Sequence, residues 1–279
     1  MKSVLITGCS SGIGLCVAQG LHARGYRVFA TARQEADVAL LAAQGLEALR
    51  LDISDTHSIN AAADEVLART GGTLYALFNN AGYGQPGAVE DLTRDALRQQ
   101  FETNVFGMLE LTNRFIPVMR RQGEGRILQN SSLLGYVALA YRGAYNASKY
   151  AIEGLSDTLR LELRGSGVQV CLIEPGPIRS RFRANAYAMY QRMINREASF
   201  HRARYAAMEA RLVKVGPAAP FTLGPEAVLA KVIHALESPR PRLRYRVTQP
   251  AYFFAWGKRW LSDRMMDRIL GAVSDNEVK

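Results

Sequence analysis

The sequence predicts an α/β fold in which a parallel β-sheet carries helices on both faces. Over the first 175 residues, short apolar runs alternate with longer helical patterns. A glycine-rich turn follows the first apolar run, and polar motifs come directly after several later runs. This alternation requires crossover connections, which make successive strands parallel. Ligands of such sheets bind beyond the carboxyl ends of the strands, where all of these motifs are expected to meet.

Each expected strand is a short apolar run bounded by turn residues. The expected strands are Val4–Ile6, Arg27–Thr31, Ala48–Leu51, Leu74–Phe78, Gly125–Gln129, Val168–Ile173 and, near the end of the chain, Leu243–Thr248. Helices are expected up to about residue 23, up to about residue 44, and over 58–69, 94–121, 144–164 and 222–237. We predict a single domain, 1–279, with a helical lid inserted at about 181–220 and a C-terminal extension at about 240–279.

The composition is that of a globular protein. Of the 279 residues, 48% are hydrophobic and 22% are charged, and no apolar stretch is long enough for a transmembrane helix. The short first apolar run leads into a glycine motif, which favours a buried strand over a signal peptide. The cysteines Cys9, Cys16 and Cys171 are odd in number and lack metal-ligand spacing. They indicate a reduced, cytoplasmic protein with no metal site.

Positive charge is concentrated in two late segments. The net charge is +10; residues 179–214 contribute nine basic and two acidic residues, and residues 238–279 contribute nine and four. Solvated helix faces are the favoured interpretation. Attraction of an anionic cofactor, an anionic substrate or an acidic membrane surface is the alternative. Nucleic acid is disfavoured because neither segment contains a nucleic-acid-binding motif.

A glycine motif, T-G-C-S-S-G-I-G, joins the first strand to the first helix. Gly8, Gly12 and Gly14 permit a tight turn and a close approach of the backbone to a pyrophosphate on the helix N-terminus. The hydroxyls of Ser10 and Ser11 add hydrogen-bond donors. An ordinary strand-to-helix turn is the alternative, but the context of the motif favours nucleotide binding.

The end of the second strand indicates which nucleotide binds. NAD sites of this fold usually place an acidic residue there, about 20 residues after the glycines, to hold the ribose 2′-hydroxyl. Here the strand ends in Arg33, whose guanidinium can bind a 2′-phosphate. The sequence therefore favours NADP(H), although Arg33 could also cap a surface strand. Asp52 lies just after the third strand. It is expected either to accept a hydrogen bond from the adenine amino group or to stabilise a turn.

Tyr145 and Lys149 lie four residues apart, on one face of an expected helix. Tyrosine has a pKa of about 10, and we expect the lysine and an oxidised nicotinamide to lower it. Ser132 ends a strand 13 residues earlier and can donate to a carbonyl oxygen. Asn104 lies inside a long helix, where asparagine is unfavourable, so it is expected to form a polar contact or hold a water. Together these residues predict acid–base chemistry with Tyr145 as the proton-transfer group.

Jointly, these motifs resemble the short-chain dehydrogenases/reductases. The match spans about the first 180 residues. It includes the glycine motif, N-N-A-G at 79–82, P-G-P-I at 175–178 and the residues Asn104, Ser132, Tyr145 and Lys149. The resemblance implies a doubly wound, Rossmann-type sheet of about seven strands. It implies catalytic roles for Asn104, Ser132, Tyr145 and Lys149. The expected cofactor-binding residues are Gly8, Ser10, Ser11, Gly12, Ile13, Gly14, Arg33, Asp52, Ile53, Asn80, Ala81, Gly82, Tyr145, Lys149, Pro175, Gly176, Ile178 and Ser180.

The same resemblance implies how these residues act. Ser132 and Tyr145 would bind the substrate oxygen, Lys149 the nicotinamide ribose, and Asn104 a water in a proton path past Lys149. Ser180 stands where the family commonly has threonine. T-G-C-S-S-G-I-G and A-T-A-R are similar to the NADP(H)-using branch with 17β-hydroxysteroid and retinol dehydrogenases. F-T-L-G-P-E-A-V and M-D-R-I-L-G are similar to bacterial aldehyde/ketoaldehyde reductases.

We therefore expect hydride transfer between NADP(H) and an apolar aldehyde or ketone. An apolar pocket is expected, unless the lid aromatics merely pack on the core; its lining would be Leu133, Leu134, Tyr136, Tyr187, Met189, Tyr190 and Met193. Residues 247–261 combine the aromatic side chains Phe253, Phe254, Trp256 and Trp260 with Lys258 and Arg259. Burial in the lid or in a subunit interface is expected for this segment at least as much as contact with a membrane.

Two other functional classes share some of these features. A nucleotide-binding sensor with little turnover would have the same fold, but the four catalytic positions are intact. Sugar epimerases and dehydratases share Tyr-x3-Lys, but their glycine spacing and larger C-terminal domain do not fit. The resemblance also implies a homodimer or homotetramer formed through the helices at 94–121 and 144–164.

Overall fold

Seven parallel strands form one sheet in the order β3-β2-β1-β4-β5-β6-β7. This computed structural model describes residues 1–277. The strands are β1 (Ser3–Ile6), β2 (Arg27–Ala32), β3 (Glu47–Arg50), β4 (Ala76–Asn79), β5 (Gly125–Asn130), β6 (Val168–Glu174) and β7 (Arg244–Arg246). The predicted doubly wound parallel sheet is confirmed, and each predicted strand is present within two residues of its expected ends.

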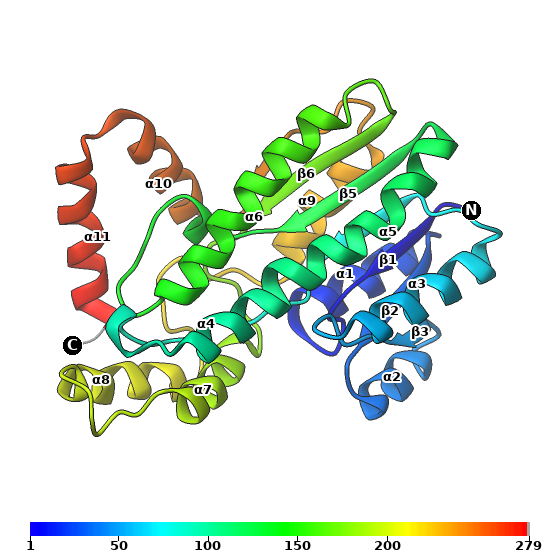
Figure 1. Cartoon of the computed structure of the whole chain (residues 1–279). Coiled ribbons are helices and arrows are strands. Elements are labelled where there is room, and N and C mark those ends of the chain that lie inside the picture. The colour runs from blue at the N-terminus through cyan, green and yellow to red at the C-terminus, as the bar shows by residue number, and fades with distance from the viewer. Residues whose placement is uncertain (278–279) are drawn as a thin grey trace.

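Helices cover both faces of this sheet, as Figure 1 shows. Alternate side chains of one strand enter different cores: Val4 and Ile6 pack on one side, and Leu5 packs on the other. The first core is covered by α1 (Gly12–Ala23), α2 (Glu35–Ala42) and α9 (Glu226–Glu237). The second is covered by α3 (Thr56–Thr70), α5 (Gly107–Gln122) and α6 (Gly143–Glu162). Strands buried on both faces explain why their sequences are continuously apolar.

The helix predicted over 94–121 is interrupted. α4 (Arg94–Phe101) begins after Thr93, whose hydroxyl accepts from the Ala96 N–H at 3.1 Å. A π-helical turn, η2 (Glu102–Phe106), then leads into α5. Gly107 allows α5 to pack closely, because a Cβ there would lie 1.6 Å from the Ile53 carbonyl oxygen.

Two further helix pairs and two 3₁₀ turns complete the described chain. They are α7 (Phe182–Met193) with α8 (Arg202–Val213), α10 (Gln249–Trp260) with α11 (Asp263–Glu277), η1 (Val89–Asp91) and η3 (Leu133–Gly135). Figure 1 shows both pairs at the end of the molecule where α6 begins. The predicted extension at 240–279 reaches two residues, 278 and 279, that lie outside the described part. No helix within residues 1–277 has both the length and the apolarity needed to cross a membrane.

The helix predicted from residue 222 begins later than expected. Leu223 forms an isolated parallel bridge with Ile178, and Pro225 precedes the first turn of α9. The helix therefore starts at Glu226, after the Gly224–Pro225 pair. This bridge ties the segment before α9 to the segment after β6.

Candidate active site

The predicted motifs meet beside β1, where the strand order reverses. β1 lies between β2 and β4, so the chain builds the sheet outward from it in both directions. Such a switch point opens a crevice beyond the carboxyl ends of the strands. A cavity of about 990 Å³ lies there, and its wall includes the turn after β1, Asn80–Gly82 after β4 and Ser131–Ser132 after β5.

The glycines of the turn have conformational and steric reasons to be glycine. Gly8 and Gly12 have φ values of +71° and +60°, which strain any residue with a Cβ. A Cβ at Gly14 would lie 2.2 Å from the Gly8 carbonyl oxygen, so α1 packs directly on the turn. The backbone at this turn is thus left open for a ligand to approach closely.

The N-terminus of α1 fits a pyrophosphate. Ser11 stands at the N-cap, and its hydroxyl makes no hydrogen bond to the helix, so the first N–H groups lack a side-chain cap. Ser10, Ser11 and Ile13 line the cavity at this point. Uncapped N–H groups and free hydroxyls form the donor set that a phosphate requires. The structure therefore fits a dinucleotide in the predicted place.

Arg33 lines a second, more open cavity of about 600 Å³, together with Glu35, Arg50 and Asp52. Arg33 is exposed and forms no ion pair with any residue of the described chain. The nearby carboxylate of Glu35 lies 3.6 Å from Arg50 Nε. The sequence analysis missed Arg50, which ends β3 beside the end of β2 and brings a second guanidinium to this cavity.

Asp52 has the turn role that was one of its two predicted alternatives. Its Oδ1 accepts from the backbone N–H of Ser54 at 3.0 Å and from the Ser54 hydroxyl at 2.7 Å. Ile53 packs its side chain in the core and lines neither cavity, so a contact with a cofactor would use its backbone.

A chain of hydrogen bonds connects α6 to the glycine turn. Lys149 Nζ donates to the Asn130 carbonyl oxygen at 2.6 Å, and the Asn130 amide donates to Asn80 Oδ1 at 3.0 Å. The Asn80 amide in turn donates to the carbonyl oxygens of Thr7 at 2.9 Å and Gly8 at 3.1 Å. Thr7 and Asn130 were not predicted, although each is a polar residue at the carboxyl end of a strand.

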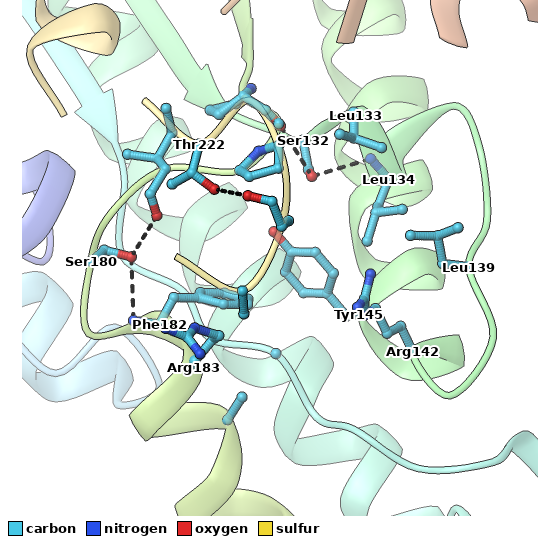
Figure 2. Close-up of a pocket in the computed structure, with 18 of the residues that line it drawn as sticks. Ser132, Leu133, Leu134, Leu139, Arg142, Tyr145, Ser180, Phe182, Arg183 and Thr222 are labelled. Carbon is cyan, nitrogen blue, oxygen red and sulfur yellow. Dashed lines mark hydrogen bonds between the residues drawn. The ribbon is translucent and has the colours of Figure 1, made fainter. Parts of the chain in front are cut away.

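Tyr145 projects from α6 into the main cavity. Figure 2 shows its hydroxyl directed toward the space between Ser132 and Thr222, with Phe182 beside the ring. The rings of Tyr145 and Phe182 pack edge to face with centroids 5.3 Å apart. Ser132 caps η3, accepting from the Leu134 N–H at 3.1 Å, and donates to the Pro175 carbonyl oxygen at 3.4 Å. The structure thus brings both predicted hydroxyls to one wall.

Burial dominates the pKa of Tyr145, whose predicted lowering rests on Lys149 together with an oxidised nicotinamide. Burial raises the pKa of Tyr145 to about 12, and hydrogen bonding by Ser132 and the charge of Arg142 oppose this rise only in part. Burial also lowers the pKa of Lys149 to about 8, although the Glu153 carboxylate opposes that change. Lys149 Nζ lies 5.5 Å from the centroid of the Tyr145 ring. Desolvation is therefore the dominant influence on the pKa of this phenol.

Asn104 lies in the π-helical turn and forms the polar contact that the sequence predicted. Its side-chain amide donates to the Tyr83 carbonyl oxygen and to Ser148 Oγ, both at 3.0 Å, and its Oδ1 accepts from the Tyr83 N–H at 3.1 Å. Widened π turns often occur at functional sites. Asn104 thereby joins the loop after β4 to α6, one residue before Lys149.

The segment after β6 closes over the glycine turn. Pro175, Gly176, Ile178 and Ser180 all line the main cavity. A Cβ at Gly12 would lie 2.9 Å from Ser180 Cβ, so the two segments face each other closely. Ser180 Oγ accepts from the Phe182 N–H at 3.3 Å, which joins this segment to the start of α7.

The rest of the main cavity is lined by η3 and the loop after it, by α7 and α8, by the loop between α8 and α9, and by α10 and α11. Its apolar wall consists of Leu133, Leu134, Leu139, Ala140, Phe182, Ala186, Met208, Leu212, Phe253, Phe254 and Val273. Leu133 and Leu134 were predicted; the other predicted lining residues, Tyr136, Tyr187, Met189, Tyr190 and Met193, do not line it. Tyr187 and Tyr190 pack with Tyr205 of α8, the alternative considered for lid aromatics. At one side, Glu277 pairs with Arg142 and Arg211.

Comparison with known proteins identifies the family. A family model for short chain dehydrogenases matches residues 2–191. The chain belongs to the short-chain dehydrogenase family. Members are oxidoreductases that act on CH–OH or carbonyl groups with NAD(H) or NADP(H). The described residues of this chain contain no cluster of side chains suited to a metal ion. This chain is accordingly an oxidoreductase that binds a nicotinamide nucleotide and a small-molecule substrate.

Several members of the family are similar over nearly the whole chain. The uncharacterized oxidoreductase YbbO of Escherichia coli strain K12 is 46% identical over 96% of this chain and 94% of its own. Human 17-beta-hydroxysteroid dehydrogenase type 1 is 36% identical, with 88% and 77% covered. The NADPH-dependent 3-dehydrocapnine reductase of Ornithobacterium rhinotracheale is 31% identical, with 96% of each covered. A Burkholderia phymatum short chain dehydrogenase/reductase solved with NAD has a TM-score of 0.78 at 28% identity, with 97% and 95% covered.

Proposed function

We propose that this chain is an NADP(H)-dependent oxidoreductase that interconverts an apolar aldehyde or ketone and its alcohol, with Tyr145 as the proton-transfer residue. The observation that carries the proposal is the placement of Tyr145 and Ser132 in the wall of one largely apolar cavity that also contains the glycine turn. A protonated tyrosine is the form that can donate to a carbonyl oxygen during reduction.

The choice of NADP(H) rests on the second cavity. Arg33 and Arg50 present two guanidiniums there, and Arg33 has no protein partner among the described residues. A guanidinium binds a phosphate through paired, charge-assisted hydrogen bonds. Among relatives, the 3-dehydrocapnine reductase is NADPH-dependent, whereas the Burkholderia structure contains NAD. The choice of cofactor in this chain therefore depends on its own residues at this cavity.

In the proposed reaction, the side chains hold the substrate oxygen and move one proton. When bound, the nicotinamide supplies the hydride for reduction or accepts it for oxidation. Tyr145 donates its proton to the carbonyl oxygen as that oxygen becomes an alcohol, and Ser132 donates a hydrogen bond to the same oxygen. The Pro175–Ser180 segment lies beside the place of reaction and would hold the nicotinamide end of the cofactor.

Lys149 and Asn104 are proposed to support the proton step. Lys149 is fixed by Asn130 and would bind the nicotinamide ribose. The side-chain amide of Asn104 donates to Tyr83 and Ser148, and its oxygen accepts from the Tyr83 N–H. These hydrogen bonds hold the loop after β4 against α6. A water bound near this junction would return a proton to Tyr145 past Lys149.

The substrate class follows from the apolar wall and the α7–α8 pair, which we propose to be the lid. Phe182, Met208 and Leu212 from this pair face the same cavity as Tyr145. A second copy would contact α6 and the helical segment formed by α4, η2 and α5; Phe106 of η2 and Tyr150 and Leu161 of α6 are exposed. The three unpaired cysteines fit a cytoplasmic location.

The test replaces Tyr145 with phenylalanine and follows NADPH oxidation over a panel of aldehydes, ketones, retinoids and steroids. We expect NADPH binding to persist and turnover to fall by about 10²–10⁴. Tyr187→Phe is the matched control, because Tyr187 lies in α7 but does not line the cavity. Near-normal turnover of the Tyr145→Phe variant would refute the mechanism. Silence of the wild type across the whole panel would refute the proposed activity.

A further inference from the structure

α10 presents a continuous row of exposed aromatic side chains. Tyr252, Trp256 and Trp260 recur at four-residue intervals, and Phe253 lies beside them on the same face. Their exposed fractions are 47%, 60%, 67% and 53%, respectively. The opposite face of the helix is packed, because Ala251, Phe254 and Gly257 are buried against η3 and α11. The sequence analysis allowed burial in a lid for these aromatics, but the fold leaves this row uncovered.

Exposed basic side chains lie on α10 and at the start of α11. Lys258 and Arg259 of α10 and Arg264 and Arg268 of α11 are exposed, and with Asp263 and Asp267 they give residues 249–268 a net charge of +2. None of the four basic side chains forms an ion pair within the described part of the chain. An exposed aromatic face on a segment of net positive charge matches the chemistry of an anionic bilayer surface.

We propose that α10 docks on an anionic phospholipid membrane, with its aromatic row inserted at the headgroup level and its basic side chains on the lipid phosphates. Tryptophan and tyrosine favour this interface because their rings are apolar at one end and polar at the other. A second copy of the chain is a poorer occupant. A twofold contact through this face would bring the net positive charge of residues 249–268 against its own copy, in a chain of net charge +10.

Docking in this way places the main cavity next to the membrane. Gln249, Pro250 and Phe253 belong to α10 and also line the cavity, so the exposed row continues into its wall. Figure 1 shows α10 and α11 at the outer end of the molecule, beyond the start of α6. A membrane-dissolved carbonyl compound would therefore have a short path to Tyr145, a consequence that rests on the proposed function.

The two tryptophans of the chain, Trp256 and Trp260, both lie on this face. Intrinsic tryptophan fluorescence therefore reports on α10 alone. With vesicles of phosphatidylcholine containing phosphatidylglycerol, we expect a blue shift and quenching by lipids brominated in their acyl chains. Binding to these vesicles should exceed binding to pure phosphatidylcholine by about 30-fold, from about a factor of five for each net positive charge. The excess should fall as salt is raised.

Variants separate this proposal from its alternatives. Tyr252→Glu keeps both tryptophans and should weaken binding at least about tenfold, because a charge replaces an inserted ring. Leu40→Glu, at an exposed apolar position on α2, should bind like the wild type. Tyr145→Phe should also bind normally, so that loss of the proposed chemistry and loss of docking are distinguishable.

Three outcomes would overturn the proposal. The first is no change of emission with either vesicle. The second is equal binding to both vesicle types. The third is a dimer, seen by sedimentation without lipid, that Trp256→Glu dissociates, because the row would then be a contact between copies.

Discussion

The replacement Arg33→Asp tests the cofactor preference directly. Arg33 is exposed and forms no ion pair within the described chain. Binding of a 2′-phosphate by Arg33 therefore breaks no existing ion pair. The charge-assisted hydrogen bonds lost with the guanidinium amount to about 1.5–3 kcal/mol, or about 10- to 150-fold in NADPH affinity. An aspartate adds about 1–3 kcal/mol of repulsion toward the phosphate at about 5 Å.

The same aspartate should help NADH. A carboxylate at the end of β2 can accept from a ribose 2′-hydroxyl, a hydrogen bond that contributes about 0.5–1.5 kcal/mol. We therefore expect the ratio of NADPH to NADH affinity to fall by at least about 10². Arg50 remains in place and should retain part of the NADPH affinity, so Arg33→Asp with Arg50→Ala should lower it further.

Titration of the purified variants with NADPH and NADH, followed by nucleotide fluorescence at fixed ionic strength, measures both affinities without turnover. Arg164→Ala is the control. It removes an exposed arginine at the amino edge of the sheet, far from the second cavity. An unchanged affinity ratio in Arg33→Asp, or an equal loss of NADPH binding in Arg164→Ala, would refute the assignment of Arg33.

The remaining predictions concern stability and pH. Gly107→Ala places a Cβ 1.6 Å from the Ile53 carbonyl oxygen and should lower the free energy of unfolding in urea by more than about 3 kcal/mol. Gly271→Ala, in α11 with no neighbour within 4 Å, should raise it by about 0.5–1 kcal/mol; equal effects would contradict the packing argument. If Lys149 must be charged, kcat/KM should decline as pH rises through its pKa of about 8. Glu153→Gln removes the carboxylate that raises this pKa, so the decline should move to lower pH, and an unmoved pH profile would contradict this role.

The sheet and the nucleotide end of the site could be predicted because their signals are local. Apolar runs define strands, and the glycines of the first turn are required by backbone geometry within seven residues. Parallel strands then bring their carboxyl ends together, so separate motifs such as Asn80 and Ser132 meet without further information. Arg50 escaped notice because its approach to Arg33 depends on the pairing of β2 with β3.

The substrate end could not be predicted in the same way. The α7 helix has aromatic and methionine side chains on several faces, and the sequence does not specify which face turns inward. Tyr190 packs on Tyr205 of α8, with ring centroids 5.4 Å apart, and so does not line the cavity. Phe182 and Ala186 line the cavity instead. The exposure of Trp256 and Trp260 likewise depends on how α10 packs on η3 and α11.

The pKa of Tyr145 shows why proximity in sequence is a poor measure of electrostatic effect. Lys149 lies one turn away, yet its ammonium is held on the Asn130 carbonyl oxygen and is itself destabilised by burial. Burial penalises the phenolate at the same time and so favours the protonated form of Tyr145. Reduction needs this acid, whereas alcohol oxidation needs the phenolate and so needs a positive charge beside the ring. Reduction therefore uses Tyr145 in the form that burial favours, whereas oxidation at neutral pH would use the positive charge of an oxidised nicotinamide to stabilise the phenolate.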